Sequence, residues 1–216
     1  MVPKPPPDWV ALTPRFTPGW PWPEDSYGLD PMYGEDGWCQ GCGMPLVEQT
    51  GPLFMQGSKF PRAEVWTPSW LFDVVCVSAQ LATSVAERFA LDFKEVHKPR
   101  TGPAGAMQML PTRTSEPWHR PDELAQAIRA RHSEFSDATT GSTCPLCGRW
   151  KWLPIGEQDA PVKAASVMSA NDLIASPEVF GSGLSSFRHL LFRRPLGEIL
   201  VSASPRNWDL VEVVID

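Results

Sequence analysis

The stretch Cys39-Gln40-Gly41-Cys42-Gly43 has a counterpart much later in the chain, Cys144-Pro145-Leu146-Cys147-Gly148. We call these two segments the knuckles. In each, the two-residue gap lets both sulfurs face one ion, and the final glycine can adopt positive φ, which turns backbone N–H groups towards the thiolates. Two Cys-x-x-Cys turns supply the four tetrahedral ligands that structural zinc prefers. The sequence therefore predicts one structural Zn²⁺ site whose ligands are Cys39, Cys42, Cys144 and Cys147.

The spacing of the knuckles is unusual, because they lie about a hundred residues apart where zinc-ribbon pairs are separated by about 15 to 20. A ribbon-like site thus requires a large insertion, and the metal would clamp early and late parts of the chain together. Redox-active thiols and an iron site with four sulfur ligands are the alternatives. Neither knuckle is followed by the helical pattern typical of a redox site. Four thiolate ligands would leave no open position for water, so a catalytic metal is disfavoured.

The composition is that of a folded chain, since 42% of the 216 residues are hydrophobic and 20% are charged. The 24 prolines, concentrated in the first third and around residues 99–121, predict much irregular structure. Proline lacks the N–H that helix interiors and central strands need. Four tryptophans would anchor these loops to the core: Trp9, Trp20, Trp22 and Trp38.

The net charge of −6 disfavours binding to nucleic acid or to an anionic membrane, because both use surfaces rich in lysine and arginine. It suits a basic protein partner. No stretch approaches about 18 consecutive apolar residues, and the proline-rich start lacks the apolar core of a signal sequence. Five cysteines do not make a disulfide framework in a chain of this length, and Cys76 is left over. We therefore expect a cytoplasmic protein.

The expected fold class is α+β, with few helices and β-rich halves around the four-cysteine clamp. Residues 1–37 would form a proline- and tryptophan-rich arm, and residues 38–216 one α+β domain. The segment 99–142 would hold a linker up to Pro121 and then a helix. Apolar patterning predicts strands at 70–78, 92–96, 150–152, 198–202 and 210–215, and helices at 79–89, 121–132 and 170–180.

An internal repeat divides the domain into two related halves, 38–98 and 143–216. Val77-Ser78-Ala79 precedes Asp92-Phe93-Lys94-Glu95-Val96, and Val201-Ser202-Ala203 precedes Asp209-Leu210-Val211-Glu212-Val213. Each of these two pairs of short segments follows one knuckle. The second connector, 204–208, is too short for a helix and contains Pro205 and Asn207, so we expect a tight turn between antiparallel strands. Chance similarity of short β-rich words is the alternative.

Other reactive side chains give weaker signals. The four histidines, His97, His119, His132 and His189, lack the spacing of metal ligands, so we expect surface or hydrogen-bonded roles. Cys76 lies in an apolar run and is expected to be a small buried hydrophobe. The one basic cluster, made of Arg188, His189, Arg193 and Arg194, is expected to be a solvated face.

Both knuckles, their wide separation and the Val77-Ser78 segment before an amphipathic helix resemble the double-CxxCG-motif proteins, a paralogous family best known from myxobacteria. The resemblance covers most of residues 38–216. Members of that family look like immunity proteins, which neutralise a cognate polymorphic toxin inside the producing bacterial cell or its kin. The resemblance implies a chain that is not an enzyme and that binds a toxin protein, with zinc holding its shape.

The short second connector and the proline-rich arm depart from the family pattern, so the resemblance does not locate a toxin-binding surface. Two alternatives from other classes remain open at the level of the sequence. One is a thiol-disulfide redox protein, and the other is a zinc-ribbon nucleic-acid-binding protein, which the acidic charge disfavours. The oligomeric state is also open.

Overall fold

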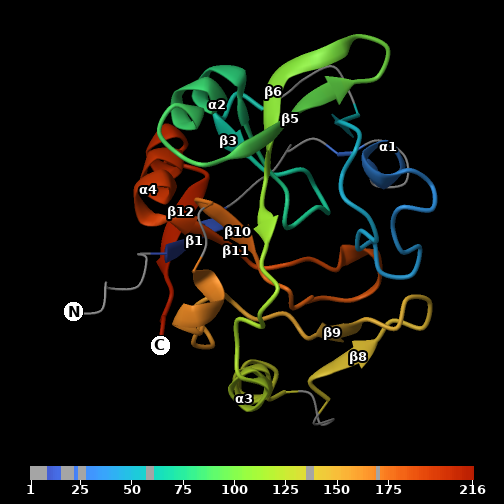
Figure 1. Ribbon diagram of the computed structural model, residues 1–216, viewed down its shortest axis with the longest axis vertical. Helices are drawn as coiled ribbons and strands as arrows, with labels where there is room; N and C mark the ends of the chain where they lie inside the picture. Colours follow the sequence, from blue (N-terminus) through green and yellow to red (C-terminus); the bar gives the residue numbers. More distant parts are fainter. Residues whose placement is uncertain (1–8, 16–21, 24–27, 57–60, 135–138, 169–170) are drawn as a thin grey trace.

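The computed structural model describes residues 9–15, 22–23, 28–56, 61–134, 139–168 and 171–216. In this part of the chain, the fold contains two five-stranded sheets and a separate two-stranded hairpin (Figure 1). The first sheet has the strand order β2-β5-β6-β4-β3, and the second has the order β12-β1-β11-β10-β7. The expected fold class, a β-rich mixed structure with few helices and clustered cysteines, is confirmed.

The first sheet consists of β2 (Leu53–Phe54), β3 (Val65–Trp66), β4 (Val75–Ser78), β5 (Asp92–Lys98) and β6 (Gly102–Leu110). Ser78 ends β4 and caps helix α2 (Ala79–Ala86), because its hydroxyl accepts a hydrogen bond from the N–H of Leu81 at 3.2 Å. The expected strand, helix and strand are therefore confirmed here. The first strand is shorter than 70–78, since Trp70 has a φ of 70°, which interrupts an extended run. The short helix α1 (Leu29–Tyr33) contacts β2.

The second sheet consists of β1 (Trp9–Pro14), β7 (Thr112–Arg113), β10 (Leu173–Ala175), β11 (Leu190–Arg193) and β12 (Trp208–Glu212). Strand β1 lies between β11 and β12 and is antiparallel to both. Val10 and Leu12 enter the main core, while Trp9 and Ala11 enter a second apolar cluster. The expectation of an irregular arm is wrong for Trp9–Pro14, because apolar residues on both sides make this segment a central strand. Residues 1–8 and 16–21 lie outside the described ranges.

Three further expectations are wrong. The linker expected at 99–121 contains β6 and β7, which only Pro111 separates. The helix expected at 170–180 is absent from its described residues, 171–180, which contain strand β10 instead, since Pro177 opposes a continuous helix. The strand expected at 198–202 belongs to helix α4 (Arg194–Ala203). Pro195 lies in the first turn of α4, where its missing N–H costs nothing, and Leu196 and Leu200 are buried one turn apart.

A repeat exists in the topology, but only one of the two pairs of similar segments is equivalent: residues 92–96 and 209–212 fall on corresponding strands, whereas the Val-Ser-Ala segments do not. In each half a strand leads directly into a helix: β4 leads into α2, and β11 leads into α4. The strand after the helix, β5 in the first half and β12 in the second, is parallel to the strand before the helix. One antiparallel strand lies between the two. The middle strand is β6 in one sheet and β1 in the other, and both lie outside the expected ranges 38–98 and 143–216. From here on, the first half means the sheet of β2 to β6 with α1 and α2, and the second half means the sheet of β1, β7 and β10 to β12 with α4. Val77-Ser78 ends a strand, whereas Val201-Ser202-Ala203 ends a helix. The turn expected at 204–208 is present, but it joins helix α4 to β12 and not two antiparallel strands.

Helix α3 (Pro121–Arg131) and the hairpin of β8 (Gly141–Thr143) and β9 (Trp150–Trp152) lie at one end of the molecule (Figure 1). Both α3 and β9 were expected from the sequence and are confirmed. Two 3₁₀ turns, η2 (Ala164–Val167) and η3 (Gly183–Ser185), complete the described elements. Within the described ranges, no helix combines the length and apolar character that crossing a membrane requires.

The two halves share one core. Helix α4 of the second half contacts β3 of the first, and apolar residues of both sheets belong to one buried cluster. Two buried hydrogen bonds join the halves: Trp208 Nε1 donates to the Val65 carbonyl at 3.0 Å, and the Val65 N–H donates to Ser204 Oγ at 2.9 Å. Of the tryptophans expected as anchors, Trp9 and Trp38 are buried, Trp22 is 51% exposed, and Trp20 lies outside the described residues.

Candidate metal centre

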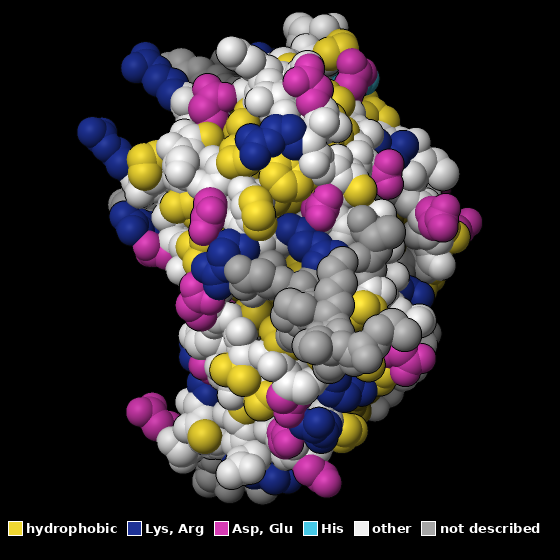
Figure 2. All heavy atoms as spheres, turned by 60° about the vertical axis from the view of Figure 1, so that its left-hand side comes forward, with side chains coloured by type: hydrophobic (Ala, Val, Ile, Leu, Met, Phe, Trp, Pro, Cys, Tyr) yellow, Lys and Arg dark blue, Asp and Glu magenta, His cyan; other side chains and the backbone are white. Residues whose placement is uncertain are grey.

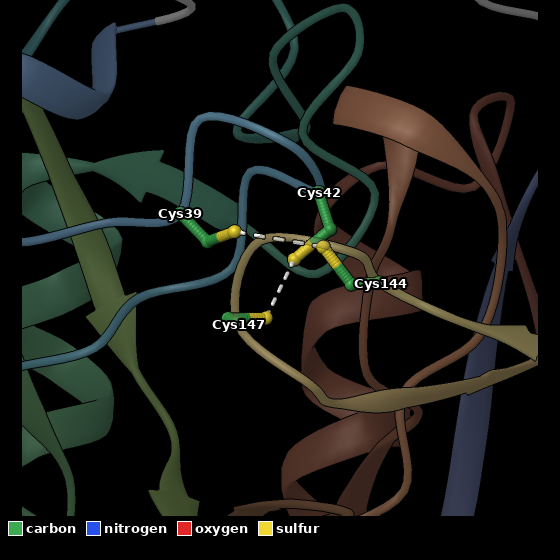
Figure 3. A group of neighbouring side chains, drawn as sticks. All are labelled: Cys39, Cys42, Cys144 and Cys147. Carbon is green, nitrogen blue, oxygen red and sulfur yellow. Dashed lines mark hydrogen bonds between the residues drawn. The ribbon is translucent and has the colours of Figure 1, made fainter.

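The four predicted cysteines meet at one point between the knuckles, and each sulfur lies within 4.8 Å of the others. Cys39 and Cys42 come from one loop and Cys144 and Cys147 from another, with all four sulfurs pointing towards a common centre (Figure 3). The sulfur–sulfur distance is 3.7 Å for Cys39 and Cys144 and also for Cys42 and Cys147. A tetrahedron with metal–sulfur bonds of about 2.3 Å has edges of about 3.8 Å, whereas a disulfide is only about 2.05 Å long. The cluster therefore has the dimensions of a metal site.

The two knuckles have the same backbone geometry. In the first, the N–H of Gly43 donates to the Cys39 carbonyl at 2.7 Å, and the N–H of Cys39 donates to the Met44 carbonyl at 3.0 Å. In the second, Gly148 donates to the Cys144 carbonyl at 2.9 Å, and Cys144 donates to the Arg149 carbonyl at 2.8 Å. Gly43 and Gly148 have φ values of 72° and 71°. The left-handed backbone conformation after each second cysteine thus requires a glycine at that position, as the sequence indicated.

The electrostatics of the cluster favour a thiolate at one position and oppose it at another. The backbone N–H groups of Cys147 and Leu146 lower the pKa of the Cys144 thiol below its ordinary value, because they donate to its sulfur. Burial raises the pKa of the Cys42 thiol, against the effect of the Met44 N–H. A bound cation would stabilise all four thiolates, and it would compensate for their burial.

The cluster is enclosed by the knuckles themselves. Cys39, Cys42 and Cys144 are buried together with Met44 and Val179, while Cys147 is partly exposed. Gly41 approaches so closely that a Cβ atom there would lie 3.1 Å from the sulfur of Cys144. The guanidinium of Arg149 reaches from the second knuckle to the Pro45 carbonyl beside the first, with Nη2 at 3.4 Å. The site thus joins segments that are far apart in the sequence.

The remaining residues from the sequence analysis lie elsewhere. Cys76 is fully buried in β4, as expected, and burial raises the pKa of its thiol. His119 and His189 are buried and each contacts a backbone carbonyl, that of Pro161 at 2.8 Å and that of Ile155 at 3.2 Å. These contacts fit the expected hydrogen-bonded role.

The expectation of a solvated basic face is wrong for Arg188 and His189, which are only 7% and 1% exposed. Both directly precede β11, a strand whose two faces are covered by apolar clusters, so their side chains also lie in the interior. Their position directly before the apolar run 190–192 was the signal in the sequence. Asp73 gave no signal in the sequence, and its carboxylate accepts the backbone N–H of Arg188 at 3.1 Å.

These features define a mixed α/β protein with two topologically related halves and a four-cysteine cluster that could hold a metal ion. Comparisons of the chain with protein-family models, curated proteins and solved structures found no significant match.

Proposed function

We propose that the chain is a non-enzymatic immunity protein that binds and neutralises a cognate bacterial toxin, and that its four knuckle cysteines hold a structural zinc ion. The observation that carries the proposal is the pair of 3.7 Å sulfur–sulfur distances between knuckles, which match a tetrahedral site. The resemblance of the knuckles to the double-CxxCG-motif proteins supports the immunity role.

A structural role for zinc follows from the donor set. Four thiolates fill the coordination sphere, so no position remains for an activated water or a substrate. Redox chemistry is a weaker alternative, because the Cys144 thiol, the one with the lowered pKa, is buried rather than accessible to a partner thiol. The ion would instead clamp the loops around residues 37–49 and 139–152 to each other, and its binding free energy would add to the stability of the fold.

A toxin-facing surface beside the knuckles is supported by exposed apolar side chains. Leu46 and Val47 follow the first knuckle and are 51% and 52% exposed, and Leu146 inside the second knuckle is 68% exposed. Trp150, at the start of β9, is 42% exposed. Large apolar side chains on a rigid surface are typical of protein interfaces. On the face shown in Figure 2, basic side chains are interspersed with acidic ones, which suits a protein partner better than a nucleic acid.

The zinc proposal is tested by metal analysis of the full chain purified under reducing conditions. We expect one zinc ion per chain in the wild type and none in the double variant Cys39→Ser/Cys144→Ser. Cys76→Ser removes a thiol outside the cluster and should retain the full zinc content. A chain that carries iron, or one that forms a reversible disulfide within a knuckle without bound metal, would contradict the proposal.

The immunity proposal predicts that a gene adjacent to this one encodes a toxin, and it is tested by co-expressing the chain with the product of that gene. We expect survival of the cells and a 1:1 complex on size-exclusion chromatography. Leu146→Glu should weaken the complex and the protection without changing the zinc content. Met168→Glu is a matched control, because Met168 is 70% exposed and follows η2, away from the knuckles. No complex and no protection would refute the immunity role.

A further inference from the structure

A cavity of about 930 Å³ lies between the two halves, next to the metal centre. The first half contributes to its wall from α1, the loop after the first knuckle and the end of β6, and the second half from β7, β10 and the segment before β11. Small-molecule sites in proteins have volumes of about 300–1,000 Å³ and often lie where two structural units meet. The cavity is therefore large enough for a small organic ligand.

Three arginines from separate segments line this cavity: Arg113 on β7, Arg149 after the second knuckle, and Arg188 before β11. None of them belongs to an ion pair with a carboxylate among the described residues. Burial, together with the positive charges of Arg113 and Arg149, lowers the pKa of Arg188 to about 10, against the effect of Asp73. The three guanidinium groups thus repel one another across the cavity.

The hydrogen bonding of these arginines also leaves donors for a ligand. Arg149 donates from Nη2 to Pro45, but its Nη1 is buried and has no hydrogen-bond partner in the structure. A buried N–H donor of a charged group that has no acceptor destabilises the folded state, and an oxyanion in the cavity would accept a hydrogen bond from it. Arg188 is held in place by hydrogen bonds from Nη1 to the carbonyls of Ser176 and Pro177, at 2.7 and 2.6 Å.

The acidic side chains of the cavity do not cancel this charge. Asp73 already accepts the backbone N–H of Arg188, and its single carboxylate faces three arginines; burial raises the pKa of that carboxyl. Glu48 and Asp92 also line the cavity but are exposed, so water screens them. Leu71, Val74 and Leu184 add an apolar wall.

We propose that this cavity binds a small organic anion, whose carboxylate or phosphate group is held by Arg113, Arg149 and Arg188 and whose apolar part lies against Leu71, Val74 and Leu184. The cavity borders the proposed toxin-facing surface, because Leu46 and Val47 belong to both. The two proposals can fail separately, since Leu146, the residue varied in the toxin test, does not line the cavity.

The test is isothermal titration calorimetry on the zinc-loaded full chain with three probes of similar shape: phenyl phosphate, phenylacetate and the neutral phenylacetamide. We expect saturable binding of one anion at one site and no binding of the amide. Tighter binding of phenyl phosphate would assign the site to phosphate esters, and tighter binding of phenylacetate to carboxylic acids.

Arg113→Gln and Arg149→Gln should each weaken that binding about tenfold or more, because each removes a charged hydrogen-bond donor. Arg113 is exposed, so its replacement should leave the fold intact, and Arg129→Gln on the exposed side of α3 is the matched control that should bind as the wild type does. The proposal is wrong if neither anion binds, if the amide binds as well as the anions, or if both cavity variants bind like the control.

Discussion

Gly43 and Gly148 have the same backbone conformation in different surroundings. A Cβ atom at Gly43 would lie 2.9 Å from the Leu184 carbonyl oxygen, whereas one at Gly148 would meet no atom within 4 Å. Gly148→Ala should therefore cost only the strain of a left-handed alanine, about 1–2 kcal/mol. Gly43→Ala should cost at least about 1 kcal/mol more, because the loop of Leu184 must move. Urea unfolding of both zinc-loaded variants measures the difference, and equal losses would contradict the asymmetry.

His189 makes the stability of the fold dependent on pH. Burial, together with the charge of His119, lowers the pKa of its side chain to about 3, while a histidine in an unfolded chain has a pKa of about 6.5. Between these values the unfolded state binds a proton that the folded state does not bind. The free energy of unfolding should therefore fall as the pH drops from about 6.5 towards about 3, by up to about 1.4 kcal/mol per pH unit.

Replacing His189 by glutamine should flatten this dependence, since glutamine keeps a donor for the Ile155 carbonyl but does not titrate. The measurement is urea unfolding of the zinc-loaded chain between pH 7 and pH 5. His132→Gln, at a half-buried position at the end of α3, serves as the control and should keep the slope of the wild type. The same slope in all three proteins would show that His189 is not the group responsible.

At the scale of elements, Gly197 sets the distance between helix α4 and the second sheet. A Cβ atom on Gly197 would lie 2.7 Å from Cγ2 of Val10 in β1. Alanine is the better helix former by about 1 kcal/mol, yet Gly197→Ala should destabilise the protein, because a stiff valine side chain in a buried strand cannot move aside. We expect a net loss of about 1–2 kcal/mol in thermal or urea unfolding.

A double-mutant cycle isolates this contact. Val10→Ala removes the methyl group that clashes, so Gly197→Ala should cost less, or even stabilise, in the Val10→Ala background. If the effect of Gly197→Ala is the same in both backgrounds, the close approach is not what limits this position.

Local signals explain which elements could be predicted from the sequence. Ser78 and Pro121 mark the starts of α2 and α3 correctly, since a cap or an N-terminal proline acts within its own turn. The same signal, Pro195, was present for α4, but the short apolar run 199–201 favoured a strand. Strand β6 was missed because Gly102, Pro103 and Gly105 suggest a loop. Pro103 is tolerated there because it pairs with His97, where the register between β5 and β6 shifts.

At the scale of the whole molecule, metal removal should loosen one region rather than separate the halves. The knuckles meet at the cysteine cluster, whereas the halves also share a buried apolar core and the hydrogen bonds of Trp208 and Ser204 to Val65. Chelation of the zinc should lower the melting temperature, and the first proteolytic cleavages should fall in the loops 37–49 and 139–152.

Mass spectrometry of limited digests before and after chelation checks this expectation. Cleavage that begins instead between β3 and β4, or between α4 and β12, would show that the metal holds the whole core together. The Cys76→Ser variant should give the wild-type digestion pattern in both states, because its zinc ligands are intact.

The spacing of the cysteines was sufficient to predict that the four lie together. Each Cys-x-x-Cys-Gly segment forms its own turn, and four ligands of one ion must be close to one another. The cavity beside them could not be predicted in this way. Arg113, Arg149 and Arg188 come from three separate segments, and only the packing of one half against the other brings them to a common wall. Long-range arrangements of this kind have no signature in a local window of sequence.

The position of β1 also bears on how the chain is made. Trp9–Pro14 leaves the ribosome before every other described strand, yet its neighbours, β11 and β12, are synthesised only after all strands of the first sheet. The first half can complete its sheet once β6 has emerged, but the nascent second sheet must wait for the strands on either side of Val10. Until then this apolar segment lacks its neighbours, and the time needed to translate the residues between β1 and β12 sets how long it stays exposed.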